Sequence, residues 1–186
     1  MLKLTFHNKS AKYLGSSPWT FKEKLFQILW SITWKCFCSW TPKPLYSWRL
    51  FWLRVFGGSV HGKPFIHQSV KVKIPWKLIL HDKSCLGEGA VIYSLDQIEI
   101  CEAAIVAQEA YLCTGTHDFT HPNRPLLTGK IKIGKMAFIG ARAFIMPGVT
   151  IGDNAVIGAY SLVTKDVDRD LVVGGNPAKP IKQNEM

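Results

Sequence analysis

The sequence predicts an all-β fold, a left-handed parallel β-helix built from hexapeptide repeats, with an α-helical segment on its N-terminal side. Two observations support this prediction. From Val60 onward an aliphatic residue returns every six positions, whereas before Gly57 the chain is rich in tryptophan and basic residues. An α-helix would return apolar residues at three and four positions and an antiparallel strand at two, so neither explains a period of six.

A period of six fits a solenoid whose coil has three flat sides, each a short strand paired in parallel with the next coil. We expect the repeating aliphatic residues to point into this coil: Ile74, Leu80, Leu86, Ile92, Ile100, Val106, Leu112, Ile133, Ile139, Ile145, Ile151, Ile157 and Val163. A small or aliphatic residue often follows four positions later, as at Ala137 and Thr116, where the interior is narrow. Glycine often follows directly, as at Gly140, and tolerates the compact backbone of a corner.

The chain divides near Gly57 into a helical, basic and aromatic segment (1–57), a β-helix domain (58–181) and a C-terminal tail (182–186). Six of the seven tryptophans lie between positions 19 and 52. We expect a first helix that begins near residues 16–18 and ends at Pro42, and a second helix over residues 45–55. Spacings of three and four give the first helix one apolar stripe, formed by Leu25, Ile28, Leu29, Ile32 and Cys36.

Positive charge accompanies these helices, at Lys22, Lys24, Lys35, Lys43, Arg49 and Arg54. No uninterrupted apolar run of about 20 residues exists, so we do not expect a membrane span. A basic, tryptophan-rich amphipathic segment can lie in the membrane interface, which predicts peripheral contact with the inner membrane face. Alternatively, the helices cap one end of the β-domain or pack against a neighbouring subunit.

Composition narrows the partners and the location. The formal net charge of +10 suits nucleic acid, anionic lipid or a phosphorylated ligand. Zinc-finger spacing, a basic region leading into heptads and aromatic RNA-binding motifs are missing from the sequence, so we expect no nucleic-acid partner. Five cysteines without regular spacing, together with the lack of a secretory signal, predict reduced thiols in a cytoplasmic protein.

One large insertion interrupts the repeat at residues 118–130, directly after His117. It is polar and holds Pro122 and Pro125, and loops on such scaffolds often carry function, so we expect it to project over a site. Histidine suits acyl transfer to a hydroxyl because its ordinary pKa of about 6.5 lets it accept a proton near neutrality. The position of His117 beside this loop predicts that it is the catalytic residue.

Several motifs resemble those of the hexapeptide-repeat acetyltransferases, which include galactoside and maltose acetyltransferases. They are TGTHD at the loop, IGKMAFIGARAFIMPGVTIGDNAVIGAYSLVTKD after it, and VVGGNPAKPIK, and the resemblance covers residues 60–181. Further stretches are similar to the colanic acid biosynthesis acetyltransferases: LFWLRVFGG, Pro75-Trp76, IYSL and YLCTGTHD. These extend the resemblance across nearly the whole chain.

The resemblance implies an O-acetyltransferase that moves an acetyl group from acetyl-CoA to a sugar hydroxyl in exopolysaccharide or related saccharide biosynthesis. His117 matches the family's catalytic histidine, which removes the hydroxyl proton as the oxygen attacks the thioester. No acyl-enzyme is implied, so Cys113 is not expected to act as a nucleophile, and no metal is expected. A homotrimer with sites between subunits is also implied, and we expect a saccharide acceptor that is carried on a lipid.

The resemblance also places the ligands. Phe138 would form an aromatic wall beside the site, while Ala141, Ala159 and Thr164 would line the pantetheine arm and Lys165 and Lys179 would lie near the CoA phosphates. The acceptor side departs from the galactoside enzymes, because Gly87 stands in place of an asparagine and the stretch from Tyr93 to Asp96 in place of carboxylates. Tyr93 and Asp96 are the candidates for acceptor contacts.

Two other functions compete with this interpretation. A zinc enzyme resembling the γ-class carbonic anhydrases could use His81, His117 and His121 as ligands, although the slip before Ile100 makes convergence of their rings on one zinc ion difficult. A membrane-associated trimeric scaffold without enzymatic activity is the second alternative. The intact TGTHD and NPAK segments argue against the scaffold.

Overall fold

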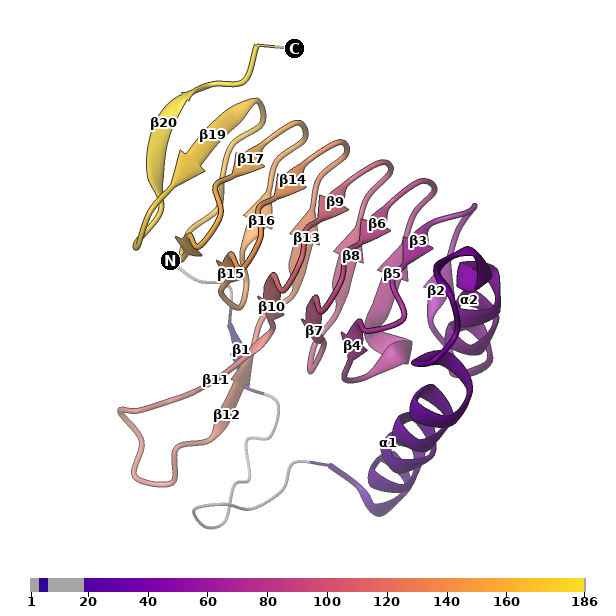
Figure 1. Ribbon diagram of the computed structural model, residues 1–186. Coiled ribbons are helices and arrows are strands. Elements are labelled where there is room, and N and C mark those ends of the chain that lie inside the picture. Colours follow the sequence, from indigo (N-terminus) through magenta and orange to yellow (C-terminus); the bar gives the residue numbers. More distant parts are fainter. Residues whose placement is uncertain (1–3, 7–18, 186) are drawn as a thin grey trace.

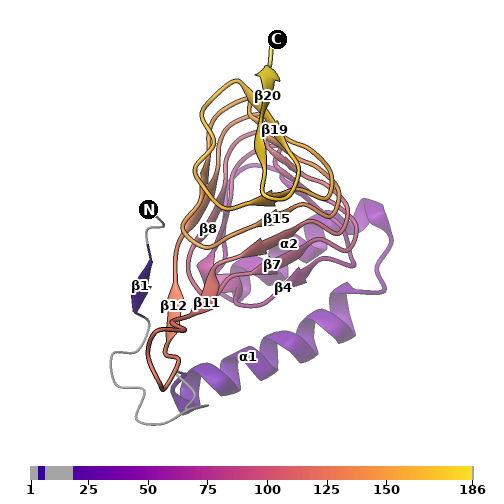
Figure 2. The same cartoon turned by 90° about the vertical axis from the view of Figure 1, so that its left-hand side faces the viewer.

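The structure is a computed structural model that describes residues 4–6 and 19–185, and it confirms the predicted fold class. Parallel strands stack into a solenoid, with helices at one end and the C-terminal strands at the other (Figure 1). Viewed along its axis, the solenoid has a triangular outline (Figure 2). Its three sides are three sheets, which we name after the strand that each contributes to one central coil.

The β8 sheet has five parallel strands: β2 (Ser59–Val60), β5 (Leu78–Leu80), β8 (Ile98–Ile100), β13 (Ile131–Ile133) and β16 (Thr150–Ile151). The β9 sheet contains β3 (Phe65–Ile66), β6 (Cys85–Leu86), β9 (Ile105–Val106), β14 (Phe138–Ile139), β17 (Val156–Ile157) and β19 (Leu171–Gly174), and ends on the antiparallel β20 (Lys179–Gln183). The β10 sheet contains β4 (Lys71–Val72), β7 (Val91–Tyr93), β10 (Tyr111–Cys113), β15 (Phe144–Ile145) and β18 (Leu162–Val163).

The interior of the solenoid consists of the predicted aliphatic residues, all thirteen of which are buried. One of them, Ile74, does not lie in the strand to which the six-residue count assigned it. Val72, not Ile74, pairs with Ile92 in the β10 sheet, and Ile74 lies buried in the following corner. The two-residue slip expected only before Ile100 therefore occurs one coil earlier as well, because the 3-10 turn Pro75–Lys77 occupies that corner.

The corners do not depend on glycine in the way that the sequence suggested. Left-handed backbone, with φ between 54° and 58°, occurs at Lys83, Ala103, Glu109, Met136, Arg142, Asn154, Tyr160 and Asp170. Gly140 is needed for a different reason: a Cβ there would stand 2.6 Å from the backbone nitrogen of Ala159 in the next coil. Close stacking of the coils, rather than a positive φ, therefore requires this glycine.

Two helices precede the solenoid. Helix α1 (Phe21–Thr33) begins with a capping box, in which Thr20 and Glu23 bond each other's backbone N–H groups, and it continues as the π-helical turn Trp34–Cys38. The start predicted near residues 16–18 lies outside the described residues. A 3-10 turn (Lys43–Leu45) leads into α2 (Tyr46–Val55). Within the described part of the chain, no helix is long and apolar enough to cross a membrane.

Helix α2 closes the N-terminal end of the solenoid. Leu50 and Leu53 are buried in the same core as Ile66. Arg49, one of the basic residues of the helical segment, is fully buried: its guanidinium donates to the carbonyl oxygens of Ile66 and Lys43, each at 2.9 Å, and to the Thr41 hydroxyl at 2.7 Å. Burial lowers the pKa of Arg49. These acceptors explain how a cation can lie inside the protein without a carboxylate partner.

Helix α1 contacts the solenoid through one side only. Trp30 is buried and its indole N–H donates to the carbonyl oxygen of Val72 at 2.8 Å. Phe26 packs against Phe56 and Trp76, with ring centroids 5.2 and 5.1 Å apart. The apolar stripe predicted for this helix, which runs from Leu25 to Cys36, is exposed. The stripe therefore does not contribute to the core.

Candidate active site

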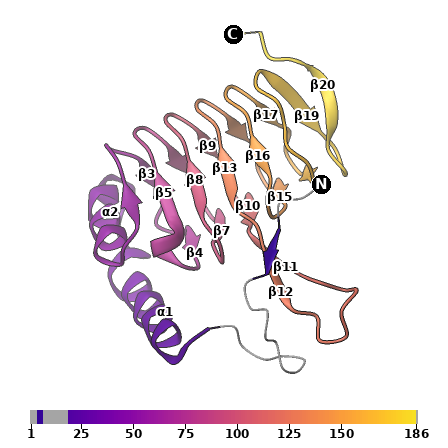
Figure 3. The ribbon, with the colours of Figure 1, turned by 180° about the vertical axis from the view of Figure 1, so that it is seen from behind.

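The insertion is an antiparallel hairpin that projects from the solenoid (Figure 3). Strand β11 (Gly115–His117) pairs with β12 (Leu126–Thr128), and β12 also pairs with the short strand β1 (Thr5–Phe6). The chain thus leaves the coil at Gly115, three residues before the predicted start of the insertion at Asp118. Thr116, counted as an interior residue of the repeat, belongs to β11 and is only half-buried, because the hairpin carries it away from the core.

His117 ends β11 and is exposed, with Leu126 opposite it on β12. Its Nδ1 lies 2.8 Å from the carbonyl oxygen of Arg124. A carbonyl oxygen only accepts, so this contact favours the tautomer in which Nδ1 carries the hydrogen. In the neutral ring, Nε2 then holds a free lone pair, which is what a general base needs.

Contacts within the loop between β11 and β12 stabilise its conformation. The Asp118 carboxylate accepts from the hydroxyl of Thr120 at 2.6 Å and from its backbone N–H at 2.9 Å. These bonds lower the pKa of the Asp118 carboxyl. The Arg124 guanidinium lies over the Phe119 ring, 6.0 Å from its centroid. The loop therefore presents the Arg124 carbonyl to His117 from a defined turn.

The two candidate acceptor residues lie at the foot of the hairpin. Tyr93 pairs with Cys113 in the β10 sheet, and its carbonyl oxygen accepts from the Thr114 hydroxyl at 2.7 Å. Asp96 donates its backbone N–H to the same hydroxyl at 2.9 Å. Burial raises the pKa of Tyr93, so its phenol keeps its proton as a hydrogen-bond donor. The Thr114 side chain thus links Tyr93 and Asp96 to the start of the hairpin at Gly115.

Aromatic rings extend from Tyr93 along the outer face of the β10 sheet. The Tyr93 and Tyr111 centroids are 6.1 Å apart, and Tyr111 stacks on Phe144 with a centroid distance of 4.9 Å. Such a row of flat apolar surfaces with phenolic hydroxyls suits contact with a ligand or with another protein chain. Tyr111 and Phe144 are in register in adjacent coils, whereas Tyr93 pairs with Cys113 and reaches the Tyr111 ring from two positions along the strand. Of these three residues, only Tyr93 was predicted from the sequence to lie in the site.

Cys113 is the cysteine nearest in sequence to His117. Its thiol donates to the Gly115 carbonyl oxygen at 3.2 Å, and burial raises its pKa. A thiol with a raised pKa is protonated at neutral pH and is a poor nucleophile. The arrangement therefore favours a base at His117 over a thiolate at Cys113.

The six positions expected to bind the cofactor do not form one cluster within a chain. Ala141 and Ala159 lie in adjacent coils at the corner between the β9 and β10 sheets, where the Tyr160 N–H donates to the Ala141 carbonyl oxygen at 2.9 Å. Phe138 is on the outer face of the β9 sheet, and Lys179 is on β20. Thr164 and Lys165 follow β18, at the corner from which the hairpin projects two coils away. The β10 sheet thus separates His117 from Ala141 and Ala159.

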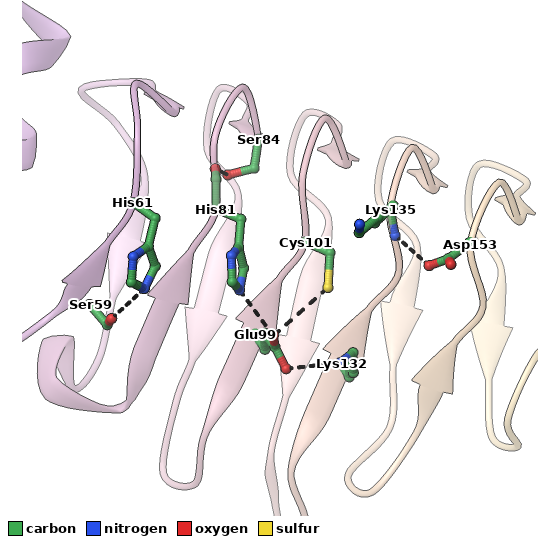
Figure 4. Close-up of polar contacts among 9 residues, drawn as sticks. All are labelled: Ser59, His61, His81, Ser84, Glu99, Cys101, Lys132, Lys135 and Asp153. Carbon is green, nitrogen blue, oxygen red and sulfur yellow. Dashed lines mark hydrogen bonds and ion pairs between the residues drawn. The ribbon is translucent and has the colours of Figure 1, made fainter.

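A second polar cluster, which was not predicted from the sequence, lies on the β8 sheet (Figure 4). The rings of His61 and His81 stack with centroids 5.1 Å apart, and His81 Nε2 lies 3.0 Å from a Glu99 oxygen. The other Glu99 oxygen lies 3.3 Å from the Lys132 ammonium. Burial alone would raise the pKa of Glu99, but the bonds from His81 and Lys132 outweigh it and lower the pKa. The Cys101 thiol, 20 positions after His81, also lies 3.9 Å from a Glu99 carboxylate oxygen. The equal spacing of His61, His81 and Cys101 was the signal for this cluster.

This cluster bears on the zinc alternative. His81 bonds Glu99 on the β8 sheet, while His117 bonds the Arg124 carbonyl on the hairpin. Among residues 4–6 and 19–185, no group of three or more histidine, cysteine, aspartate or glutamate residues could hold a metal ion.

Comparisons with known proteins agree with this geometry. The family described as bacterial transferase hexapeptide (six repeats) matches residues 130–165. The WcaF acetyltransferase assigned to colanic acid biosynthesis in Escherichia coli strain K12 is 38% identical over 157 residues, which are 84% of this chain and 86% of that protein. The chain therefore belongs to the hexapeptide-repeat acetyltransferases. The particular branch that it shares is that of the colanic acid biosynthesis acetyltransferases, as the resemblance in its motifs suggested.

Solved structures support the same assignment. A maltose O-acetyltransferase from Clostridium difficile 630 superposes with a TM-score of 0.71 at 26% identity, covering 89% of this chain and 88% of that one. A hexapeptide-repeat acetyltransferase from Vibrio cholerae, in complex with acetyl coenzyme A, superposes with a TM-score of 0.83. At 19% identity, and with 96% of this chain and 100% of that one covered, this second likeness shows the fold. Family membership favours an acyltransferase over the zinc enzyme and the scaffold.

Proposed function

We propose that this protein transfers an acetyl group from acetyl-CoA to a hydroxyl of a saccharide, with His117 as the general base. The observation that carries the proposal is the 2.8 Å hydrogen bond that His117 Nδ1 donates to the Arg124 carbonyl oxygen. It directs the Nε2 lone pair of an exposed ring away from the loop that holds it. A base with this orientation suits removal of a proton from an incoming hydroxyl.

His117 takes the hydroxyl proton while the sugar oxygen attacks the thioester carbonyl. The attack forms a tetrahedral oxyanion, which a backbone N–H donor stabilises. Collapse of this intermediate breaks the carbon–sulfur bond, and the leaving thiolate of coenzyme A takes the proton from His117. Direct transfer needs no acyl-enzyme, because holding both substrates together supplies much of the rate enhancement. The protonated state of Cys113 fits this direct route.

The active site forms between two copies of the chain in a homotrimer. Support comes from the distribution of the expected cofactor positions, because Ala141 and Ala159 lie across the β10 sheet from the hairpin of their own chain. A neighbouring copy that brings this corner to His117 would complete the site. Thr164, at the corner that carries the hairpin, would line the pantetheine arm as well. Phe138 would form an apolar wall, and Lys165 and Lys179 would meet the phosphates.

The acceptor is a saccharide of exopolysaccharide assembly, carried on a lipid and met by a cytoplasmic enzyme at the inner membrane face. The Escherichia coli relative is assigned to colanic acid biosynthesis, which motivates this choice of acceptor. Tyr93 and Asp96 are the acceptor contacts that we propose, because both are tied through Thr114 to the foot of the hairpin.

The proposal is tested by thiol release from acetyl-CoA over a panel of saccharides, with mass analysis of the products. Wild-type protein should give O-acetylated products, and His117→Ala should lower the turnover by about 10²–10⁴-fold. Arg124→Ala, which keeps the backbone carbonyl, is the matched control and should retain turnover far above that of His117→Ala. Equal turnover of wild type and His117→Ala on an accepted sugar would contradict the assigned base.

A further inference from the structure

The outer side of α1 carries an apolar surface that no part of the described chain covers. Phe21 is 81% exposed, and the other members of this outer stripe are about half exposed: Leu25, Ile28, Leu29 and Ile32. The opposite side of the helix is held by Trp30, which is 2% exposed. A contiguous apolar face of this length on a surface helix indicates a partner, since single exposed apolar residues are common but stripes are not.

The surface continues past the end of α1. Phe37 stacks on Trp52 with centroids 5.4 Å apart, and Trp48 stacks on Phe51 at 5.8 Å. The Trp48 indole N–H donates to the Phe37 carbonyl oxygen at 2.8 Å, which joins α2 to the π-helical turn. Each of Phe37, Trp48 and Phe51 remains more than two-fifths exposed. The apolar face therefore spans both helices.

The charge around this face is predominantly positive. Between positions 19 and 56 the sequence has a single acidic residue, Glu23, which is part of the capping box of α1. The exposed cationic residues in the same range are Lys22, Lys24, Lys35, Lys43 and Arg54. Apolar and tryptophan side chains bordered by lysine and arginine are typical of helices that lie in an anionic membrane interface. Each basic residue near such a surface adds attraction.

A second copy of this chain is the poorer occupant. Two such faces packed together would bring lysines of one copy opposite lysines of the other, which electrostatic complementarity disfavours. A bilayer that contains acidic lipids offers the opposite charge and an apolar layer beneath it. The charge pattern therefore selects a lipid surface over self-association.

The hairpin of the candidate active site points to the same side of the molecule. Figures 1 and 3 show α1 and the β11–β12 hairpin projecting from the same side of the solenoid. The loop at the end of the hairpin exposes Phe119, at 75%, with the Arg124 guanidinium beside it. A surface touched by α1 would therefore also be near this apolar and cationic loop.

We propose that the outer face of α1, together with Phe119 at the hairpin loop, docks on an anionic lipid bilayer and holds His117 toward saccharides displayed there. This inference rests on the proposed function in naming the saccharide site, but the docking surface stands on the exposure and charge of α1. The stripe residues and the lysines supply the contact, and the solenoid stays clear of the lipid.

The experiment measures co-sedimentation of the full chain with vesicles of phosphatidylcholine, with and without phosphatidylglycerol. Wild-type protein should bind the phosphatidylglycerol vesicles more tightly, and added salt should weaken that binding. The variant Leu25→Ser/Ile28→Ser/Ile32→Ser should bind these vesicles at least about tenfold more weakly than wild type, because the apolar area that inserts is lost. Ile181→Ser, which removes an exposed apolar residue on β20 at the far end of the solenoid, is the matched control and should bind like wild type.

Acetyl transfer to water-soluble saccharides separates the two proposals. The stripe variant should retain it at the wild-type rate, because its three residues lie outside the proposed active site. Vesicle binding without any acetyl transfer by wild type would refute the proposed function and leave the docking surface in place. Failure of wild type to bind phosphatidylglycerol vesicles, unchanged binding by the stripe variant, or an oligomer that this variant dissociates would overturn the docking surface.

Discussion

Two glycines at the same position of the repeat should respond differently to alanine. Gly140 and Gly158 each follow an interior isoleucine, and each donates its N–H to the next coil at 2.8 Å. A Cβ at Gly140 would stand 2.6 Å from the Ala159 nitrogen and from the Ile157 carbonyl oxygen. At Gly158 the nearest atoms, the Ser161 hydroxyl and the Val173 carbonyl oxygen, would be 3.4 Å away, which is ordinary van der Waals contact.

The magnitude follows from these distances. A Cβ at Gly140 would force the coils apart, which costs about 1–3 kcal/mol for overpacking. The strained hydrogen bond from the Gly140 N–H to the Ile157 carbonyl oxygen costs about 1 kcal/mol more. Gly140→Ala should therefore destabilise the protein by roughly 2–4 kcal/mol. Gly158→Ala should change the free energy of unfolding by less than about 1 kcal/mol, since the lost backbone entropy of the unfolded chain offsets small contacts.

Thermal unfolding of both variants and wild type, at one protein concentration, measures the difference. Each kcal/mol corresponds to roughly 2–4 °C for a chain of this length, so Gly140→Ala should melt well below Gly158→Ala. Equal melting temperatures of the two variants would refute the reasoning, because close stacking of the coils would then not be the reason for glycine at position 140.

Three further outcomes follow from buried or titrating groups. Arg49→Met should cost roughly 2–4 kcal/mol in urea unfolding, because it strands buried acceptors; a loss below about 1 kcal/mol would show that they are satisfied without it. Glu99 has a lowered pKa in the folded protein, so its ion pairs stabilise above the ordinary carboxyl pKa and this contribution fades as the pH falls. The melting temperature of Glu99→Gln should therefore fall less than that of wild type as the pH is lowered from about 5 to about 2, and an equal fall would contradict the pairing. Cys113→Ala should keep thiol release within about twofold of wild type, whereas a collapse of activity would point to a thiolate nucleophile.

The interior of the solenoid was predictable because it follows a strict period. Thirteen aliphatic residues were identified from spacing alone and all are buried, since each coil repeats the environment of the one before. The register predicted from the six-residue count was wrong where a corner holds extra residues. Ile74 keeps the count of six, yet the 3-10 turn that follows it shifts the strand to Val72.

Other features depend on contacts between residues distant in the sequence, which a local sequence pattern does not predict. The burial of Arg49 needs the carbonyl oxygens of Ile66 and Lys43, which only the packed helices bring together. The departure of the chain at Gly115 depends on pairing between β11 and β12, and Thr116 still fits the repeat by count. For the candidate site, the sequence indicated His117, and the structure adds the Arg124 carbonyl that orients its ring.

In the proposed active site, His117 of one copy meets a thioester held by another copy. A crystal structure with coenzyme A tests it most directly. We expect the pantetheine arm along Ala141 and Ala159 of a neighbouring copy, with its sulfur within roughly 3–4 Å of His117 Nε2. Coenzyme A bound away from every boundary between copies, or a His117 ring turned from its sulfur, would contradict the account.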